Sequence, residues 1–250
     1  MEESLPPSIQ ETPPPSTSLL SRLTNVFVAP GEVFDEIKAS PPQPINWVVP
    51  LILSMVVGVI YTLVVFSQPA ISQKMREAQE EKFQELVEAK KMTQQDADRT
   101  IAIVQKATKI MAPVFAIVGS AAMLFLSALI FWAVGLRALH GNFSYMKAVE
   151  ALGLASMISI LGAIVAMLLA VIYGNMMMTL GPALLIKPFD AANKVHRILS
   201  ALNVMSLWYV AVASIALARL SGSSFAKAAL WLFGIWAVFT FGPILAFGGK

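Results

Sequence analysis

The sequence of 250 residues contains no cysteine, only two histidines and few charged residues. Without cysteine, the chain has no disulfide framework, no cysteine-based zinc site and no thiol nucleophile. Charged residues make up 13% of the chain and hydrophobic residues 57%, whereas a soluble globular protein has about 25% charged residues. Together with a mean hydropathy of +0.70, this composition predicts an integral membrane protein whose first partner is the lipid bilayer.

Residues that could carry catalysis are also scarce. His140 and His196 lie in different connections, and neither has an acidic neighbour at metal-ligand spacing. The run Met176–Met178 could bind a soft metal, but without a nearby Cys or His it is better explained by packing at the membrane interface. Motifs for a serine nucleophile, a zinc protease or a phosphate loop are absent. We therefore predict that the protein is not an enzyme and has no catalytic site, no cofactor and no metal.

Five apolar runs are each long enough for a membrane-spanning helix, which needs about 20 residues. Lipid offers no hydrogen-bond partner to the backbone, so each run must be helical. The runs cover residues 47–66, 112–136, 148–172, 198–218 and 226–247. The sequence therefore predicts an all-α polytopic membrane protein with its membrane domain over 45–250 and its termini on opposite sides of the bilayer.

The third run carries small residues at four-residue spacing, which places them on one helix face. They are Ala151, Ala155, Ser159 and Ala163. The backbone of another helix can approach such a face closely, so we expect this face to form the packing centre of the bundle. The alternative is that alanine is simply common in membrane spans.

Two polar regions precede the first span. Residues 1–18 are rich in Pro, Ser and Thr and lack the basic start of a signal peptide, which predicts a disordered tail. Residues 19–44 form a juxtamembrane segment. In it, Phe27, Val33, Phe34 and Ile37 would share one face of a short amphipathic helix at the membrane surface, and the alternative is a plain linker. Pro30 fits the first turn of a helix.

The connection over residues 67–110 is the longest polar segment, with eight Lys/Arg and seven Asp/Glu. Its apolar residues recur at helical spacing, and Thr93 followed by Asp96 indicates a helix start. We predict a charged helical hairpin between the first and second spans, with its two helices meeting near Met92 and the second continuing into the next span. The hairpin either binds a protein partner or packs only against itself.

A short motif occurs before both the third and the fifth spans. Tyr145 and Lys147-Ala148 in the first copy correspond to Phe225 and Lys227-Ala228 in the second. An interfacial aromatic residue and a lysine that extends toward the headgroups explain both copies without a ligand. Internal repeats also occur in transporters, which keeps transport open as an alternative function.

Three further motifs follow one another along the chain. They are Pro30 and Phe34 before the first span, Gly141 and Phe143 in the turn before the third, and Ser206, Leu207 and Trp208 in the fourth. In this order they resemble the bacterial branch of the YIP (Ypt-interacting-protein-like) family. The resemblance implies a five-helix fold with a cytoplasmic N-terminus in the bacterial cytoplasmic (inner) membrane. Rab binding, known for eukaryotic members, is not carried over, because the Asp-Leu-Tyr-Gly-Pro type motif of that branch is absent.

Two classes of function fit the sequence. The first is a membrane scaffold or adaptor whose polar loops, above all residues 67–110, bind protein partners, and a homo-oligomer is compatible with it. The alternative is a small-molecule or lipid transporter of scramblase type, which protein-dependent flux in proteoliposomes would reveal. Ion-coupled transporters usually carry ionisable residues within the membrane, and the centres of these spans have none, so the scaffold is preferred. The net charge of +3 without a dense basic run does not favour nucleic acid as a partner.

Two arguments about orientation conflict. Six Lys/Arg lie on the side of the N-terminus and twelve on the other, so the positive-inside rule alone places the N-terminus outside. Eight of the twelve belong to the predicted hairpin, and without them the count is six against four. This second count agrees with the family resemblance, and we predict a cytoplasmic N-terminus.

Cysteines introduced as Ser8→Cys and Gln84→Cys test this orientation in intact cells with a membrane-impermeant thiol reagent. We expect position 84 to be labelled at once, because the hairpin would face outward, and position 8 only after the membrane is opened. The opposite labelling pattern would contradict the prediction.

Overall fold

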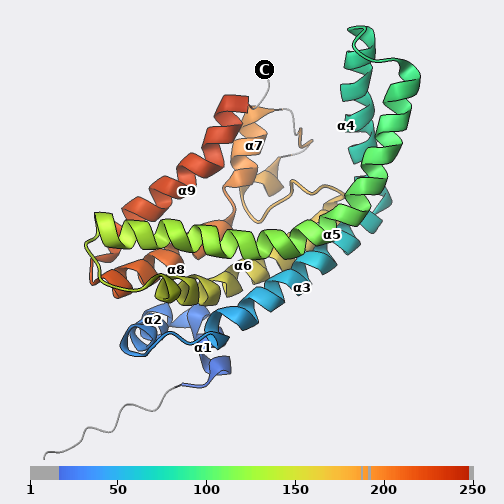
Figure 1. The fold of residues 1–250 in the computed structure, drawn as a ribbon. Helices are drawn as coiled ribbons and strands as arrows, with labels where there is room; N and C mark the ends of the chain where they lie inside the picture. Colours follow the sequence, from blue (N-terminus) through green and yellow to red (C-terminus); the bar gives the residue numbers. More distant parts are fainter. Residues whose placement is uncertain (1–16, 187, 191–192, 248–250) are drawn as a thin grey trace, which may run out of the picture.

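Long helices form almost all of the structure (Figure 1). The computed structural model describes residues 17–186, 188–190 and 193–247, and no strand occurs in these ranges. Five helices are long and apolar enough to cross a membrane. They are α3 (Ile45–Ser67), α5 (Gln94–Ala133), α6 (Tyr145–Tyr173), α8 (Val204–Ser221) and α9 (Phe225–Phe247). The predicted all-α fold with five spanning helices is confirmed.

The fourth span differs from the prediction of one helix over 198–218. The structure instead has a short helix, α7 (Lys194–Ala201), followed by a break and then α8. The side chain of Asn203 accepts a hydrogen bond from the Met205 N–H at 2.9 Å and so caps α8. Asn is a strong N-cap residue because it satisfies a free N–H of the first turn, and this local preference divides the apolar run.

The juxtamembrane segment forms two helices, α1 (Leu19–Val28) and α2 (Pro30–Ala39), rather than one. Pro30 occupies the first turn of α2, as expected. The predicted tail over 1–18 lies outside the described residues except for Thr17 and Ser18. The Ser18 side chain accepts a hydrogen bond from the Ser21 N–H at 3.2 Å and caps α1.

The charged connection forms the predicted hairpin. It consists of α4 (Pro69–Glu88) and the first part of α5, which begins after the N-cap Thr93. The Asp96 N–H donates to Thr93 Oγ1 at 3.2 Å. α5 is continuous from the hairpin into the bundle and bends on the way (Figure 1). Proline inside a helix removes one backbone hydrogen bond, and we attribute the bend to Pro113, the only proline in α5.

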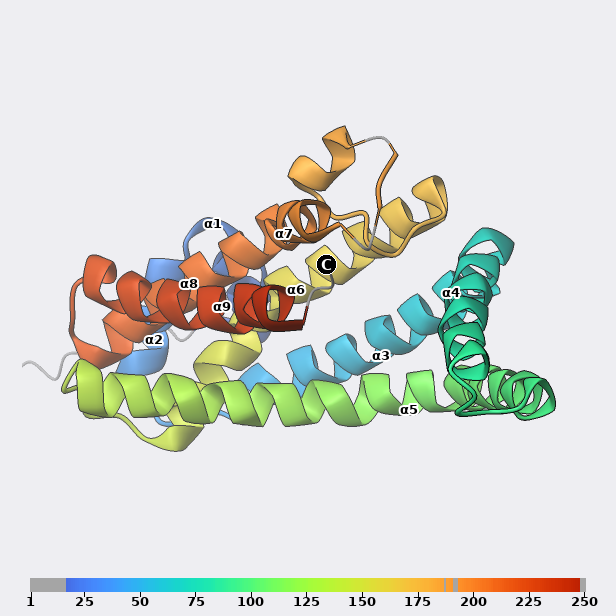
Figure 2. The same ribbon diagram turned by 90° about the horizontal axis from the view of Figure 1, so that it is seen from above.

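The two ends of the bundle carry different structures (Figures 1 and 2). At one end, α1 and α2 lie beside the α5–α6 and α8–α9 turns, and α5 ends there in a π-helical turn, Val134–Ala138. At the other end, α4 leaves the bundle and the α6–α8 connection passes through a short 3₁₀ turn, Pro182–Leu185, and α7. The hairpin and the N-terminal helices are therefore at opposite ends.

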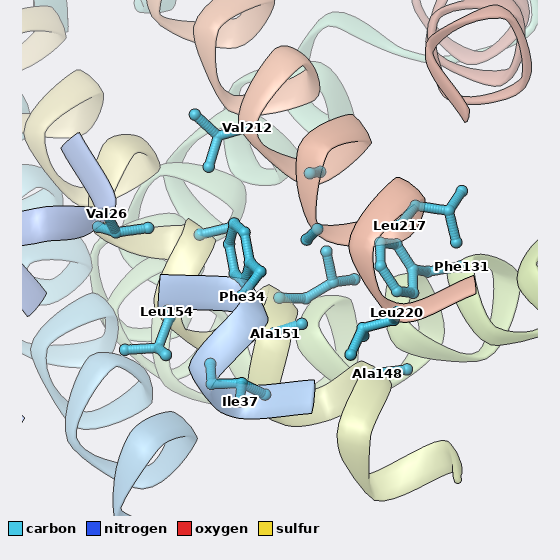
Figure 3. Close-up of a cluster of buried hydrophobic side chains, with 14 of the residues drawn as sticks. Val26, Phe34, Ile37, Phe131, Ala148, Ala151, Leu154, Val212, Leu217 and Leu220 are labelled. Atoms are coloured by element: carbon cyan, nitrogen blue, oxygen red, sulfur yellow. The ribbon is translucent and has the colours of Figure 1, made fainter. Parts of the chain in front are cut away.

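The main core lies where α2 inserts between α6 and α8. Phe34 is fully buried there together with Val33 and Ile37, and Figure 3 shows its ring among residues of α6 and α8. The apolar face predicted to lie on the membrane surface is thus covered by protein. Fully burying side chains of this size stabilises a fold by about 1.5–3 kcal/mol each, so α2 is an integral part of the bundle.

The outer faces of the spanning helices expose large apolar side chains. Leu230 on α9 is 76% exposed and Phe115 on α5 is 66% exposed. Contiguous exposed apolar surface is rare on soluble proteins. These faces are therefore suited to contact lipid.

α3 and α6 are in close contact at Gly153. A Cβ atom added at this glycine would lie 2.6 Å from Trp47 Cα, which leaves no room for any side chain. Gly234 on α9, in contrast, has nothing within 4 Å of its Cβ position. The predicted small-residue face of α6 is therefore supplemented by a glycine outside the four-residue series.

We expect Gly153→Ala to lower the free energy of unfolding by about 1–3 kcal/mol, because overpacking forces the backbones apart. Gly234→Ala is the matched control and should be neutral or stabilising by up to about 1 kcal/mol through helix propensity. Reversible unfolding of the purified protein in detergent micelles measures both. Equal stabilities of the two variants would contradict the close approach.

Candidate functional site

Four polar side chains are buried where α1, α3 and α6 meet beneath α2. They are Arg22 on α1, Asn46 on α3, and Lys147 and Glu150 on α6, and none is more than 6% exposed. Burying charged groups without partners is very costly. Their hydrogen bonds therefore decide whether this arrangement is stable, and we name these four residues with Glu36 and Gln43 the polar cluster.

Glu150 is the centre of the polar cluster and is fully buried. Its Oε1 accepts hydrogen bonds from Asn46 Nδ2 at 2.6 Å and from the Gln43 N–H at 3.2 Å. Its Oε2 accepts from Lys147 Nζ at 2.8 Å. Both carboxylate oxygens are therefore paired, and the carboxylate ties α6 to the start of α3.

Lys147 connects the same carboxylate to α2. Besides pairing with Glu150, its ammonium group donates a hydrogen bond to the carbonyl oxygen of Ile37. Ile37 lies in the last turn of α2, where free carbonyl groups favour a nearby cation. The expectation that Lys147 extends toward the headgroups is therefore wrong, because a buried carboxylate and a helix end hold its ammonium group. Lys227, its counterpart in the repeat, is exposed.

Arg22 extends the polar cluster to α1. Its guanidinium group donates to Gln43 Oε1 at 2.8 Å, to Asn46 Oδ1 at 3.3 Å and to Glu36 Oε1 at 2.7 Å. The planar guanidinium suits several acceptors at once. Two cations and two carboxylates thus balance within one connected network that joins α1, α2, α3 and α6.

Glu36 is only partly buried, with its side chain 25% exposed. Partial burial by itself raises the pKa of its carboxyl, but hydrogen bonds from Arg22 and Thr17 outweigh burial and hold the pKa below the usual value. A lowered folded-state pKa contributes stability that is complete above the unfolded-state pKa. That contribution is lost as the pH falls through the lowered pKa, so acid should weaken the attachment of α1 to α2.

The α5–α6 turn packs against the α8–α9 turn beside the polar cluster. A Cβ atom added at Gly141 would lie 2.6 Å from Ser221 Cα, so only glycine fits. Phe143 packs edge-to-face on Phe131 with ring centroids 6.2 Å apart, and its carbonyl accepts from Trp132 Nε1 at 2.9 Å. Gly141 therefore lets the two turns pack together, and Phe143 fixes the α5–α6 turn to α5.

The other motif residues divide between this end and the bundle interior. Pro30 starts α2, and Phe34 is buried between α6 and α8. Trp208 contacts Phe27 of α1 with ring centroids 5.8 Å apart. Leu207 is half-buried, and Ser206 lines a cavity between α5, α6, α8 and α9. The structure therefore does not gather all the motif residues into one site.

The two halves of the small-residue face of α6 lie in different environments. Ala151 and Ala155 are fully buried in the main core. Ser159 and Ala163 instead line the cavity that Ser206 lines. Only the half of this face nearest the polar cluster is packed against protein.

The polar cluster is absent from the sequence-based predictions. Two signals were present: Glu150 is the only charge in the third span, and Lys147 lies three residues before it, on the same helix face. Arg22 and Asn46 gave no such signal, because their partners lie far away in the sequence.

One comparison identifies the family. The profile of the Yip1 domain matches residues 24–246, nearly the whole chain. The chain belongs to the Yip1 domain family. This match confirms the resemblance to the YIP family, and with the five apolar helices it identifies an integral membrane protein. No curated protein and no solved structure matches the chain.

In this Yip1 domain protein, we expect Glu150→Leu to lower the free energy of unfolding by about 3–5 kcal/mol, because it leaves the Lys147 ammonium buried and unpaired. The double variant Lys147→Met/Glu150→Leu should recover much of that loss, since neither charge remains. Unfolding in detergent micelles measures the cycle.

Arg219→Gln is the control. It breaks the ion pair between Arg219 Nη1 and Asp35 Oδ2, 3.2 Å long and about half exposed on both sides, and should cost at most about 1 kcal/mol. The two residues are not coupled if the loss of unfolding free energy in the double variant equals the sum of the losses in the single Lys147→Met and Glu150→Leu variants.

Proposed function

We propose that this Yip1 domain protein is a non-enzymatic membrane scaffold whose α4–α5 hairpin binds a protein partner. The observation that carries the proposal is the exposure of α4. Ile71 is its only buried residue among the 20 from Pro69 to Glu88. A helix this long with so little packing is available for contacts outside its own bundle.

The root of the hairpin is fixed to the bundle. Ile71 packs in a small cluster with Val65 of α3 and Ala170 of α6. Lys74 Nζ donates a hydrogen bond to the Gly174 carbonyl at 3.1 Å. These contacts lie in the first turns of α4, so the rest of the hairpin projects as one arm (Figure 1).

The charges of the hairpin favour a protein over an anionic membrane as its target. α4 carries three basic and five acidic residues, and Arg76 Nε pairs with Glu80 Oε1 at 2.6 Å one turn later. A membrane-binding segment would be mainly basic. A mixed surface selects partners by complementary charge and speeds their encounter.

Scaffolding is preferred over transport because of where the charged groups lie. The buried ions of the polar cluster are used for packing at one end of the bundle. The residues lining the cavity between α5, α6, α8 and α9 include no Lys, Arg, Asp or Glu. An ion-coupled route would be expected to place ionisable groups along the path.

The proposal includes a location and an orientation. The protein lies in a bacterial cytoplasmic membrane with its N-terminus in the cytoplasm. The hairpin then faces the opposite compartment, and the partner is a protein of that compartment. A homo-oligomer is compatible with this arrangement, whereas nucleic acid has no role in it.

Replacing residues 78–104 by a short Gly-Ser linker tests the proposal. We expect membrane insertion and thermal stability to persist, because Ile71, Val65 and Ala170 remain, while partner proteins no longer copurify. Crosslinks from a photoreactive residue at Gln84 should identify the partner in cells.

A charge-swapped variant, Lys82→Glu/Glu85→Lys, is the sharper test. Both positions are exposed, so the swap keeps the net charge and the fold but alters the surface. We expect a loss of partner binding of roughly tenfold or more, about 1.4 kcal/mol. Unchanged binding in both variants would rule out the hairpin as the binding element.

A further inference from the structure

A large cavity opens inside the membrane-spanning part of the bundle. It has a volume of about 730 Å³ and lies between α5, α6, α8 and α9. A second cavity of about 500 Å³ adjoins it between α3, α5, α6 and α8. The two share lining residues from three helices, including Met123, Ser159 and Tyr209. Together they form one elongated slot, which we call the interhelical slot.

The chemistry of the interhelical slot favours an apolar occupant. Most of its lining is aliphatic or aromatic, for example Ile130, Ile235 and Phe239 in the larger cavity. Its polar groups are a few hydroxyls, such as that of Ser206, the Trp236 indole and one amide, that of Asn203. A buried water needs two to four polar partners, and an empty space forfeits dispersion contacts. Since the surroundings of these helices are lipid, hydrocarbon is the available filler.

The shape of the interhelical slot and the charges near one of its ends indicate which kind of hydrocarbon molecule it holds. A slot shared by two joined cavities suits a flexible chain better than a compact molecule. Its lining includes Asn203, two residues beyond the C-terminal end of α7. Lys194, His196 and Arg197 lie in the first turn of α7, farther from the slot, and the Asp190 N–H donates a hydrogen bond to His196 Nδ1. Basic side chains at the polar end of a hydrocarbon site complement a phosphate.

We propose that the interhelical slot binds one acyl chain of a glycerophospholipid from the surrounding bilayer, with the phosphate directed toward α7. The site is separate from the polar cluster and from the hairpin, and it does not require either to have a partner. Ser159 and Ala163, the unpacked half of the small-residue face of α6, then line the wall along which the chain lies.

The probe is a phosphatidylglycerol with a diazirine in one acyl chain, added at limiting amounts to the full-length protein in detergent micelles. Photolabelled residues are mapped by mass spectrometry. We expect saturable labelling of slot residues such as Ser159 and Tyr209. Val238, on the outer face of α9 and outside both cavities, serves as the internal reference for non-specific lipid contact.

Ala163→Phe places a ring in both cavities and should lower slot labelling by roughly tenfold while leaving Val238 unchanged. Leu168→Phe is the matched control, because Leu168 lies on the same helix, is exposed and lines neither cavity. If Ala163→Phe fails to fold, Ser206→Phe fills the larger cavity from α8 instead. A diacylglycerol probe with the same chains should label the slot roughly tenfold less.

Several results would overturn the proposal. Slot labelling that rises linearly with the amount of probe, as at Val238, or that persists in the filled variants would contradict a specific site. Equal labelling by the diacylglycerol would remove the role of the phosphate. Labelling that is absent from the slot, together with loss of a dimer in Ala163→Phe, would instead assign the slot to a second copy of the chain.

Discussion

The burial of Glu150 is the constraint on which the arrangement of this bundle end depends. A carboxylate with no exposed surface is stable only if every oxygen is paired, and its partners come from α3, α6 and the segment before α3. Lys147 and Arg22 then extend the same network to α2 and α1. The Lys147–Glu150 pair lies within α6, so moving α1, α2 or α3 would take hydrogen bonds away from buried charged groups. The polar cluster thereby selects one position for the N-terminal helices, and the burial of Phe34 and Ile37 supplies the apolar contribution to stability.

The opposite end of the bundle has far less buried contact. α4 is held through its first turns, and beyond them the hairpin has few buried contacts, so its charges remain available. This difference between the two ends follows from where polar residues lie in the sequence. Charges that lie next to an apolar face at the N-terminal end become buried and structural, whereas charges concentrated over 67–110 stay solvated. In this member of the Yip1 domain family, one fixed end and one exposed arm are the two features on which the scaffold proposal is based.

Much of the fold could be predicted because it depends on local signals. Run length and hydropathy predict the five spans, and Thr93 with Asp96 predicts the start of α5. The polar cluster could not be predicted, because Asn46 and Glu150 are 104 positions apart and a lone charge in a span does not identify its partners. Lys147 was misassigned for the same reason: a lysine at a helix start has the same local sequence whether it meets water or a buried carboxylate. The break before α8 depends on the Asn203 cap inside an apolar run, where hydropathy alone does not distinguish one helix from two.

Hydrogen–deuterium exchange of the wild-type protein in detergent micelles tests the central claim most directly. If the polar cluster fixes α1 and α2 to the bundle, their backbone amides over residues 19–39 should exchange as slowly as the amides of α6 around Glu150, and open with the same dependence on denaturant. Exchange of α1 and α2 at the rate of an unprotected surface helix, while α6 stays protected, would contradict the account.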